Sequence, residues 1–216
     1  MNTLHYTIDM KPVSEKTALL LLNMQNDFIR DDGAMARGNR HIPETRSLTE
    51  RLIRVTQIVQ NLPRHSIISC QFTLIADKDN HPVFPDLIKR TFPFLGRGDF
   101  HAQRTGHQLI KELQPADYSV NTIAYSAFYR THLDWLLKSL GIRNLLIAGV
   151  PTDTAILSTV RDAQINNYTA TVLTDGCAAF ESSQHTETIR SLGHLCPLRS
   201  CKEYAEEVRF LTTAEG

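Results

Sequence analysis

The sequence predicts an α/β protein: a three-layer αβα, Rossmann-like fold around a parallel sheet of six strands in the order 3-2-1-4-5-6. Two observations lead to this fold class. Short apolar runs of strand length alternate along the chain with segments of helical period, which is typical of βαβ units. The 216 residues are 42% hydrophobic and 21% charged, the composition of a globular chain that buries a sizeable core. We therefore expect a single domain over residues 1–216.

Short apolar runs are the candidate strands. They cover residues 17–22, 66–71, 118–122, 144–148 and 169–173, with a shorter sixth run near 195–198. The segment 76–105 is rich in Pro, Gly, Phe and charge and is too long for a simple connection. We expect a lid or a subunit contact there.

Apolar residues at steps of three and four predict the main helices. One begins near Pro43, another covers 131–140 and ends at Gly141 as a C-cap, and a short one begins within 106–113. Thr152 or Asp153 is the expected cap of the helix that follows the fourth strand. The predicted inner faces consist of Leu48, Leu52, Val55, Val59, Leu133, Leu136, Leu137, Leu140, Ile156, Leu157, Val160 and Ala163.

Charge and cysteine content argue against several classes of function. Twenty-three Lys and Arg against twenty-three Asp and Glu give a net charge of zero, so no general field attracts nucleic acid or an anionic membrane. The four cysteines form no Cys-x-x-Cys pair and are interpreted as reduced thiols. Residues 1–16 lack a signal-peptide pattern, and the longest apolar run is far too short to cross a bilayer. We expect a cytoplasmic protein whose partner is a small molecule.

Three segments that follow predicted strands are expected to meet at one edge of the sheet. They cover residues 23–28, 122–128 and 150–155. In an open α/β sheet the ligand crevice lies beyond the carboxyl ends of the strands, where the strand order reverses. Any chemistry is therefore expected at this junction.

These segments resemble the isochorismatase-like hydrolases, the cysteine hydrolase superfamily, and the resemblance covers nearly the whole chain. Residues 23–28 (Asn-Met-Gln-Asn-Asp-Phe) are similar to the family's Asp-x-Gln-x-Asp-Phe signature. Further similarity lies in 125–128 (Tyr-Ser-Ala-Phe) with Thr131, in 149–163, and in 175–179 (Asp-Gly-Cys-Ala-Ala). Each motif alone is weak, but four in register across one α/β chain are specific.

The resemblance implies a catalytic triad that this chain lacks. In the family an Asp moves protons, a Lys stabilises the ionised groups and a Cys thiolate attacks a carbonyl. The matching positions hold Asn23, Thr122 and Ala155. An amide is no general base, threonine carries no charge and alanine has no nucleophile, which excludes thioester chemistry at these positions. Members that hydrolyse a vinyl ether without the cysteine still rely on the aspartate, so Asn23 removes that route as well.

Residues that shape the family's pocket are kept. The candidate ligand-binding residues are Gln25, Asp27, Phe28, Tyr125, Phe128, Pro151, Thr152 and Thr154, and core packing or loop hydrogen bonding would explain several of them equally well. By resemblance to a cis peptide in the family, we expect the Val150–Pro151 bond to be cis. The amides of Thr154 and Ala155 would lie at a helix N-terminus, where a carboxylate or carbonyl ligand can bind.

Three interpretations of this pattern stay open. The first is a catalytically degenerate member that binds a small carboxylate or carbonyl ligand. The second is an active hydrolase of a vinyl ether or a small amide, with Asp27, Cys70 or Thr122 in new roles, although Asp27 is more simply a loop residue that accepts backbone N–H bonds. The third is that the substitutions were introduced to trap a substrate, which suits Asn23 and Ala155 better than Thr122.

Metals and other cofactors are not expected. Nicotinamidases of the family carry an Asp-x-His cluster beyond the second strand, whereas this chain has Cys-Gln-Phe-Thr-Leu at 70–74. His101 and His107, within and just after the long loop, are interpreted as solvated, and His185 as structural. The resemblance also implies a homo-oligomer, with residues 76–105 as the expected interface.

Overall fold

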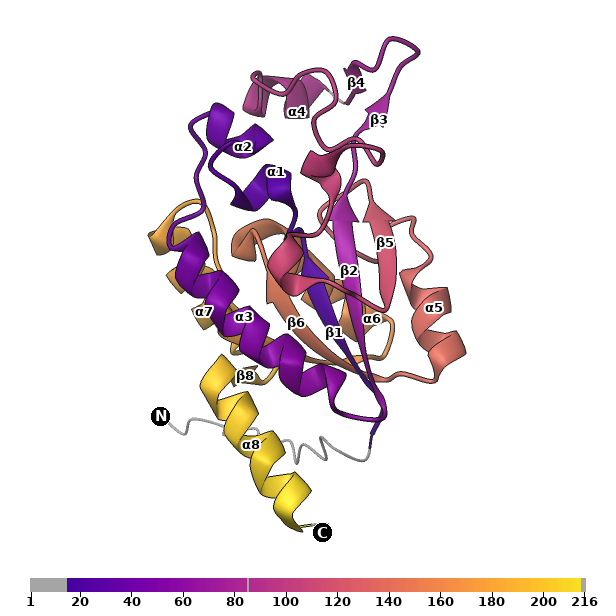
Figure 1. The fold of residues 1–216 in the computed structure, drawn as a ribbon, viewed down its shortest axis with the longest axis vertical. Coiled ribbons are helices and arrows are strands. Elements are labelled where there is room, and N and C mark those ends of the chain that lie inside the picture. Colours follow the sequence, from indigo (N-terminus) through magenta and orange to yellow (C-terminus); the bar gives the residue numbers. More distant parts are fainter. Residues whose placement is uncertain (1–14, 85, 215–216) are drawn as a thin grey trace.

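A parallel sheet forms the centre of the molecule (Figure 1). The structure is a computed structural model that describes residues 15–84 and 86–214. The strands are β1 (Thr17–Leu22), β2 (His65–Phe72), β5 (Tyr118–Thr122), β6 (Asn144–Gly149), β7 (Thr169–Cys177) and β8 (Leu198–Arg199). They pair in parallel in the order β5-β2-β1-β6-β7-β8, which confirms the predicted order 3-2-1-4-5-6.

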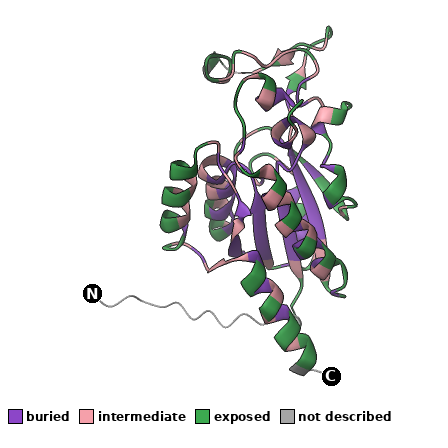
Figure 2. Ribbon diagram, turned by 60° about the vertical axis from the view of Figure 1, so that its left-hand side comes forward, coloured by how far each residue is buried: buried purple, intermediate pink, exposed green. Residues whose placement is uncertain are grey.

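Helices cover both faces of the sheet (Figure 1). One face packs against α5 (Leu133–Leu140), α6 (Leu157–Ile165) and α7 (Ser182–Leu192), the other against α3 (Thr45–Gln60) and α8 (Cys201–Ala214). Because side chains alternate along a strand, the apolar run of β1 contributes to both cores: Leu20 lies in the first, Leu19 and Leu21 in the second. Figure 2 shows the strands as the buried interior and the outer faces of the helices as exposed.

Short elements gather beyond the carboxyl ends of the strands (Figure 1). They are α1 (Asn26–Ile29), α2 (Ala34–Arg37), the antiparallel pair β3 (Ile75–Ala76) and β4 (Pro82–Val83), and α4 (Asp86–Thr91). Phe28 and Phe72 pack against the buried ring of Phe100, with ring centroids 4.8 and 5.3 Å from it. This aromatic cluster attaches the segment around residue 100 to the sheet.

The helix expected within 106–113 is wrong. The chain forms two 3₁₀ turns instead, η1 (Thr105–His107) and η2 (Lys111–Leu113). Between them, Gln108 accepts a hydrogen bond from the Asn26 amide (3.0 Å), and the Ile110 amide donates to Met24 (2.9 Å). These inter-segment hydrogen bonds use backbone groups that a continuous helix would need for itself.

Other expectations differ mainly in their boundaries. The helix expected at 131–140 begins at Leu133, whose amide donates to the Thr131 hydroxyl (3.2 Å), and Gly141 ends it at φ +70°, as a C-cap glycine should. Strand β7 continues to Cys177, four residues beyond its expected end at 173. Strand β8 (Leu198–Arg199) begins at the last residue of the run expected near 195–198. Among the described residues, no helix has the length and apolar character needed to cross a bilayer.

Candidate functional site

The three positions that the resemblance matches to the family triad lie at or beyond the carboxyl ends of β1, β5 and β6, and all three are buried. Asn23 follows β1, Thr122 ends β5, and Ala155 lies in η3 (Thr152–Ile156), the helical turn after β6. The strand register places Leu22 beside both Cys70 and Gly149, and Thr122 beside Phe72. Thr122 is thus two strands from β1, roughly 10 Å at the usual strand spacing. The expected crevice residues therefore share one edge of the sheet.

Asn23 is held by hydrogen bonds on its main chain and its side chain. Its amide donates to Cys70 O (2.8 Å), and its side-chain Nδ2 donates to Val150 O (2.9 Å). Its backbone lies at φ +54°, a left-handed conformation that asparagine tolerates better than most residues. The side chain is only 9% exposed. Asn23 therefore acts as a structural donor at the place where the family has an acid.

Ala155 follows a loop of unusual backbone geometry. Gly149 has φ +123°, and the Val150–Pro151 bond is cis, as expected. The Ile156 amide donates to Pro151 O (3.2 Å), five residues back, so the helix opens with a π-type turn. The amides of Thr154 and Ala155 lie within this first turn, where helical N–H groups have no intrahelical acceptor.

The expected cap of this helix is wrong. The N-cap residue is Pro151, and neither Thr152 nor Asp153 caps the helix through its side chain. Thr152 is fully buried, its amide donates to Ala178 O (2.9 Å), and its hydroxyl lies 2.9 Å from His185 Nδ1. His185, near the start of α7, is thus a structural residue, as interpreted from the sequence.

Most of the residues expected to contact a ligand have structural roles. Gln25 is fully buried and uses its whole amide: Nε2 donates to Phe72 O and His107 O (2.9 Å each), and Oε1 accepts from the Phe72 amide (2.8 Å). Phe28 belongs to the aromatic cluster, Phe128 packs on Tyr168 with ring centroids 5.5 Å apart, and Pro151 is buried. Tyr125 is 54% exposed, and Thr154 is half-buried, as are Phe28 and Phe128. Tyr125 and Thr154 are the candidates with a polar side chain that is not fully buried.

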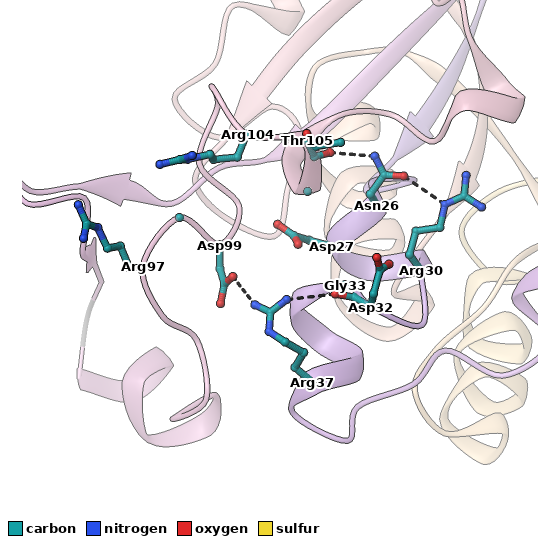
Figure 3. A pocket seen from close by; sticks show the side chains of 12 residues that line it. Asn26, Asp27, Arg30, Asp32, Gly33, Arg37, Arg97, Asp99, Arg104 and Thr105 are labelled. Atoms are coloured by element: carbon teal, nitrogen blue, oxygen red, sulfur yellow. Dashed lines mark hydrogen bonds and ion pairs between the residues drawn. The ribbon is translucent and has the colours of Figure 1, made fainter.

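Asp27 has the loop role that the sequence favours. Its carboxylate accepts the amides of Ala34 (3.1 Å) and Phe100 (2.7 Å), and burial raises its pKa in spite of these hydrogen bonds. It lies in α1 and lines a cavity whose lining includes none of Asn23, Thr122 and Ala155 (Figure 3). Asp27 therefore fixes three segments together and does not face the triad positions.

Cys70 is not a replacement nucleophile. Its side chain lies in the apolar core with Leu20 and Ile68, and it is only 1% exposed. Burial raises the pKa of its thiol to about 12, so the reactive thiolate is not populated at neutral pH. The four cysteines are free thiols, as expected.

A polar cluster beside the triad positions was not expected from the sequence. His107 is 4% exposed, and its Nε2 lies 2.8 Å from the Thr73 hydroxyl. Its main-chain oxygen accepts Nε2 hydrogen bonds from both Gln25 and Gln71. Burial, with a smaller effect of His101, lowers the pKa of His107 to about 4. The interpretation of His107 as a solvated loop histidine is wrong. Residues 108–110 form hydrogen bonds with residues 24–26, and this pairing places the His107 ring in the interior.

The same region does not suit a metal. The end of β2 presents Gln71 and Thr73 where some relatives place an Asp-x-His cluster. Over residues 15–84 and 86–214, no group of three or more His, Cys, Asp or Glu is placed to hold a metal ion. Amide and hydroxyl groups are weak ligands for the divalent transition metals that histidine and carboxylates bind.

Comparison with known proteins identifies the family. The isochorismatase domain model matches residues 17–199. A protein of Arabidopsis thaliana, named a probable inactive nicotinamidase, is 30% identical over 200 residues, which are 89% of this chain and 96% of that protein. A ureidoacrylate amidohydrolase, RutB of Acinetobacter baylyi, is 40% identical over 72 residues, which cover 32% of this chain and 29% of that enzyme.

Solved structures share the fold at low sequence identity. A cysteine hydrolase from Pseudomonas syringae pv. phaseolicola 1448A superposes with a TM-score of 0.75 at 20% identity, covering 92% of this chain and 93% of that one. An isochorismatase-like hydrolase from Alkaliphilus metalliredigens superposes with a TM-score of 0.72 at 23% identity, covering 89% of this chain and 98% of that one. Together with the match over residues 17–199, the common sheet confirms the resemblance read from the motifs: this chain belongs to the isochorismatase family.

Proposed function

We propose that this protein is a catalytically degenerate isochorismatase-family member that binds a small carboxylate or carbonyl ligand without hydrolysing it. The observation that carries the proposal is the hydrogen bond from Asn23 Nδ2 to Val150 O. The side chain at this position faces a carbonyl oxygen and can satisfy it only by donating a hydrogen bond. An amide can donate, whereas an ionised carboxylate can only accept. The site has thus adapted to the loss of the acid.

The other two positions support the same conclusion. Ala155 offers a methyl group in place of a thiolate, and Thr122 offers no positive charge in the buried crevice. Asn23 cannot act as the base, Thr122 cannot act as the cation and Ala155 cannot act as the nucleophile that the family has at these positions. The Arabidopsis relative that aligns with most of the chain is itself named a probable inactive nicotinamidase, and this name agrees with the proposal.

Binding can outlast catalysis because it depends on other groups. The amides of Thr154 and Ala155 in the first turn of η3 are suited to a carboxylate or carbonyl oxygen, and they do not depend on side-chain identity. Thr154 of this turn and the exposed Tyr125, which follows β5, are the polar candidate side chains that are not fully buried. Nicotinamide and nicotinate are reasonable first probes, since one relative is named for nicotinamide chemistry.

The alternative, an active hydrolase with relocated residues, has one observation in its favour. Thr73 is hydrogen-bonded to the neutral ring of His107 at 2.8 Å, and its amide donates to Thr122 O (2.8 Å), which places the pair beside a triad position. A hydroxyl next to an imidazole is a nucleophile and base arrangement. The low pKa of His107, about 4, makes the ring a weak base, and for this reason we favour the degenerate function.

A hydrolysis screen separates the two functions. Isochorismate and a panel of small amides, including nicotinamide and ureidoacrylate, are tested at high protein concentration with the natural chain and with the Asn23→Asp, Thr122→Lys, Ala155→Cys variant. We expect no turnover by the natural chain and turnover by the variant, with circular dichroism showing that both are folded. Turnover by the natural chain that His107→Gln and Thr73→Val both abolish would support the alternative and exclude the degenerate function.

Ligand binding is measured independently of turnover. Titration calorimetry with nicotinamide and nicotinate on the natural chain is compared with Thr154→Pro, which removes one amide donor together with the Thr154 hydroxyl, with Thr154→Val, which removes the hydroxyl alone, and with Asn166→Asp at the far end of α6. Loss of binding in Thr154→Pro but not in Thr154→Val assigns the loss to the amide. We expect saturable binding that is lost in Thr154→Pro and kept in Asn166→Asp. Equal affinity in these two variants would overturn the proposed binding mode.

We also propose that the protein self-associates. The β3–β4 hairpin, within the long segment that the sequence marks as an interface, exposes 59% of Ile75 and 57% of Val83. Light scattering during size-exclusion chromatography is expected to give a multiple of 24.4 kDa, reduced by Val83→Lys. A monomer mass for the natural chain would refute self-association.

A further inference from the structure

A cavity lies beside α1, and none of Asn23, Thr122 and Ala155 lines it. It lies between α1, α2 and residues 97–106, and has a volume of about 980 Å³ (Figure 3). Its lining includes four arginines, Arg30, Arg37, Arg97 and Arg104, so we call it the arginine pocket. Three aspartates, Asp27, Asp32 and Asp99, also line it. Figure 3 shows the Asp32 side chain beside Arg30, across the pocket from Arg97 and Arg104.

Two of the arginines are neutralised by partners. Arg30 forms an ion pair with Glu112, and Arg37 forms one with Asp99 and also donates to Asp32 O (3.2 Å). These four side chains make the wall of the pocket rigid and contribute little net charge.

Asp27 does not neutralise the remaining two arginines. Both of its carboxylate oxygens accept backbone amides, those of Ala34 and Phe100. A Cβ at Gly106 would lie 2.3 Å from one of these oxygens, so Gly106 packs closely on the carboxylate and covers it. Asp27 is therefore held by backbone amides at the floor of the pocket and makes no ion pair with Arg97 or Arg104.

Arg97 and Arg104 keep their guanidinium groups available. Within residues 15–84 and 86–214, neither guanidinium group makes a hydrogen bond or ion pair. The charge of Arg97 acts on Asp77 only as a longer-range electrostatic interaction. The Arg104 side chain lies over Gly98, whose ideal Cβ would be 3.7 Å from Arg104 Nε, and Gly98 adjoins Arg97 in the chain. Figure 3 shows both side chains on the same side of the pocket, across from Arg30.

We propose that the arginine pocket binds a small molecule that carries a phosphate group, at a site separate from the crevice of Asn23, Thr122 and Ala155. Two unpaired guanidinium groups match the double negative charge of a phosphate monoester, and their planar forks can each bind two of its oxygens. A monocarboxylate would neutralise only one of them. Open access from solvent at both arginines suits a charged ligand that keeps part of its hydration.

The pocket shares one wall with the crevice. Thr105 O, on the pocket side of η1, accepts a hydrogen bond from Asn26 Nδ2 (2.8 Å), and His107 O, at the other end of the same turn, accepts those of Gln25 and Gln71. A phosphate held beside Arg104 would stabilise this turn. The location of the site nevertheless stands by itself and does not depend on what the crevice binds.

Titration calorimetry tests the site with inorganic phosphate and pyrophosphate at constant ionic strength. The double variant Arg97→Gln, Arg104→Gln is compared with Arg54→Gln, Arg161→Gln, which removes two exposed arginines from α3 and α6. We expect saturable binding to the natural chain, weakened at least tenfold in the first variant and unchanged in the second. No binding, or an equal loss in both variants, would overturn the proposal, the latter because it would indicate general attraction by surface charge.

Chemical-shift mapping on the natural chain gives a measurement that needs no substitution. Phosphate is expected to shift the amide signals of Gly98, Thr105 and Gly106 and to leave that of Ala155 in place. Shifts confined to Thr154 and Ala155 would place the anion in the crevice instead and contradict the separate site.

Discussion

The side-chain amide of Asn23 donates a 2.9 Å hydrogen bond to the main-chain oxygen of Val150, which joins the end of β1 to the loop that precedes Ala155. The position that would supply an acid in this family therefore supplies a structural donor. The same side chain, Asn23, thus stands where the resemblance expects the acid and holds the loop in place.

Replacing Asn23 by aspartate alone should destabilise the fold. A carboxylate would face the Val150 oxygen without a proton to donate, so we expect the free energy of unfolding at pH 7 to fall by about 1–3 kcal/mol. Aspartate tolerates φ +54° nearly as well as asparagine, so backbone strain is not the cause. Urea unfolding of the two proteins measures the difference.

The pH dependence identifies the cause of this loss. At pH 4 the introduced carboxyl is partly protonated and can donate again, so the loss in Asn23→Asp should shrink. In Asn23→Gly, which accepts the same φ but has no charge, the loss should be the same at both pH values. Equal behaviour of the two variants would show that the hydrogen bond to Val150 is not what the aspartate disturbs.

His107 should make the fold sensitive to acid. The unfolded imidazole titrates near 6.5 and the folded one at about 4, because burial disfavours the charged ring. Between these values the unfolded state binds more protons, so stability falls as the pH is lowered from 6.5 towards 4, by at most about 3 kcal/mol. Urea unfolding at several pH values should show a shallower slope in His107→Gln.

The matched control for this experiment is His41→Gln, since His41 is exposed on the surface. Its stability should follow the same pH profile as that of the natural chain. A slope that is unchanged in His107→Gln would mean that other groups cause the acid sensitivity.

The sequence was sufficient to predict the strand order of the sheet and the residues that the resemblance matches to the family triad. The apolar run of β1 and the periodic Leu48, Leu52 and Val55 of α3 carry local patterns that fix the element type, and the motifs in register locate Asn23 and Ala155. Helix α8 was not predicted, although Cys201, Tyr204 and Val208 recur at three- and four-residue steps and are buried. The start signal is also present: Ser200 and Glu203 form a capping box, in which the Glu203 amide donates to the Ser200 hydroxyl (3.1 Å) and the Ser200 amide donates to the Glu203 carboxylate (2.6 Å).

The roles of individual side chains depend on contacts between distant segments, which no local pattern records. Gln25 donates hydrogen bonds to Phe72 and His107, which are 47 and 82 residues away. The motif could therefore single out Gln25 as a candidate site residue, but it could not predict that Gln25 joins these two segments. Burial of His107 follows from the pairing of residues 108–110 with 24–26, and the arginine pocket from the packing of α1 and α2 against residues 97–106.

Cys70 should be inert towards alkylation in the folded protein. Its thiol is buried in the apolar core, and its pKa of about 12 leaves almost no thiolate at pH 8. We expect iodoacetamide to label it only after unfolding in urea, as measured by mass spectrometry of the peptide that contains it. Labelling of native Cys70 at the rate of free glutathione would contradict this placement and restore it as a candidate nucleophile.

Gly149 should be the least replaceable glycine of the crevice loop. It has φ +123°, and a Cβ there would lie 2.0 Å from Leu22 O, the same oxygen that accepts the Val150 amide (2.9 Å). Gly149→Ala must therefore separate β1 from β6 at the point where Asn23 meets Val150. We expect a loss of about 3 kcal/mol or more in the free energy of unfolding.

Gly96, where an added Cβ meets nothing within 4 Å, provides the matched control, and Gly96→Ala should change the free energy of unfolding by no more than about 0.5 kcal/mol. Similar small effects of both substitutions in urea unfolding would show that the loop before Ala155 can relax, and that its geometry is not what preserves the crevice.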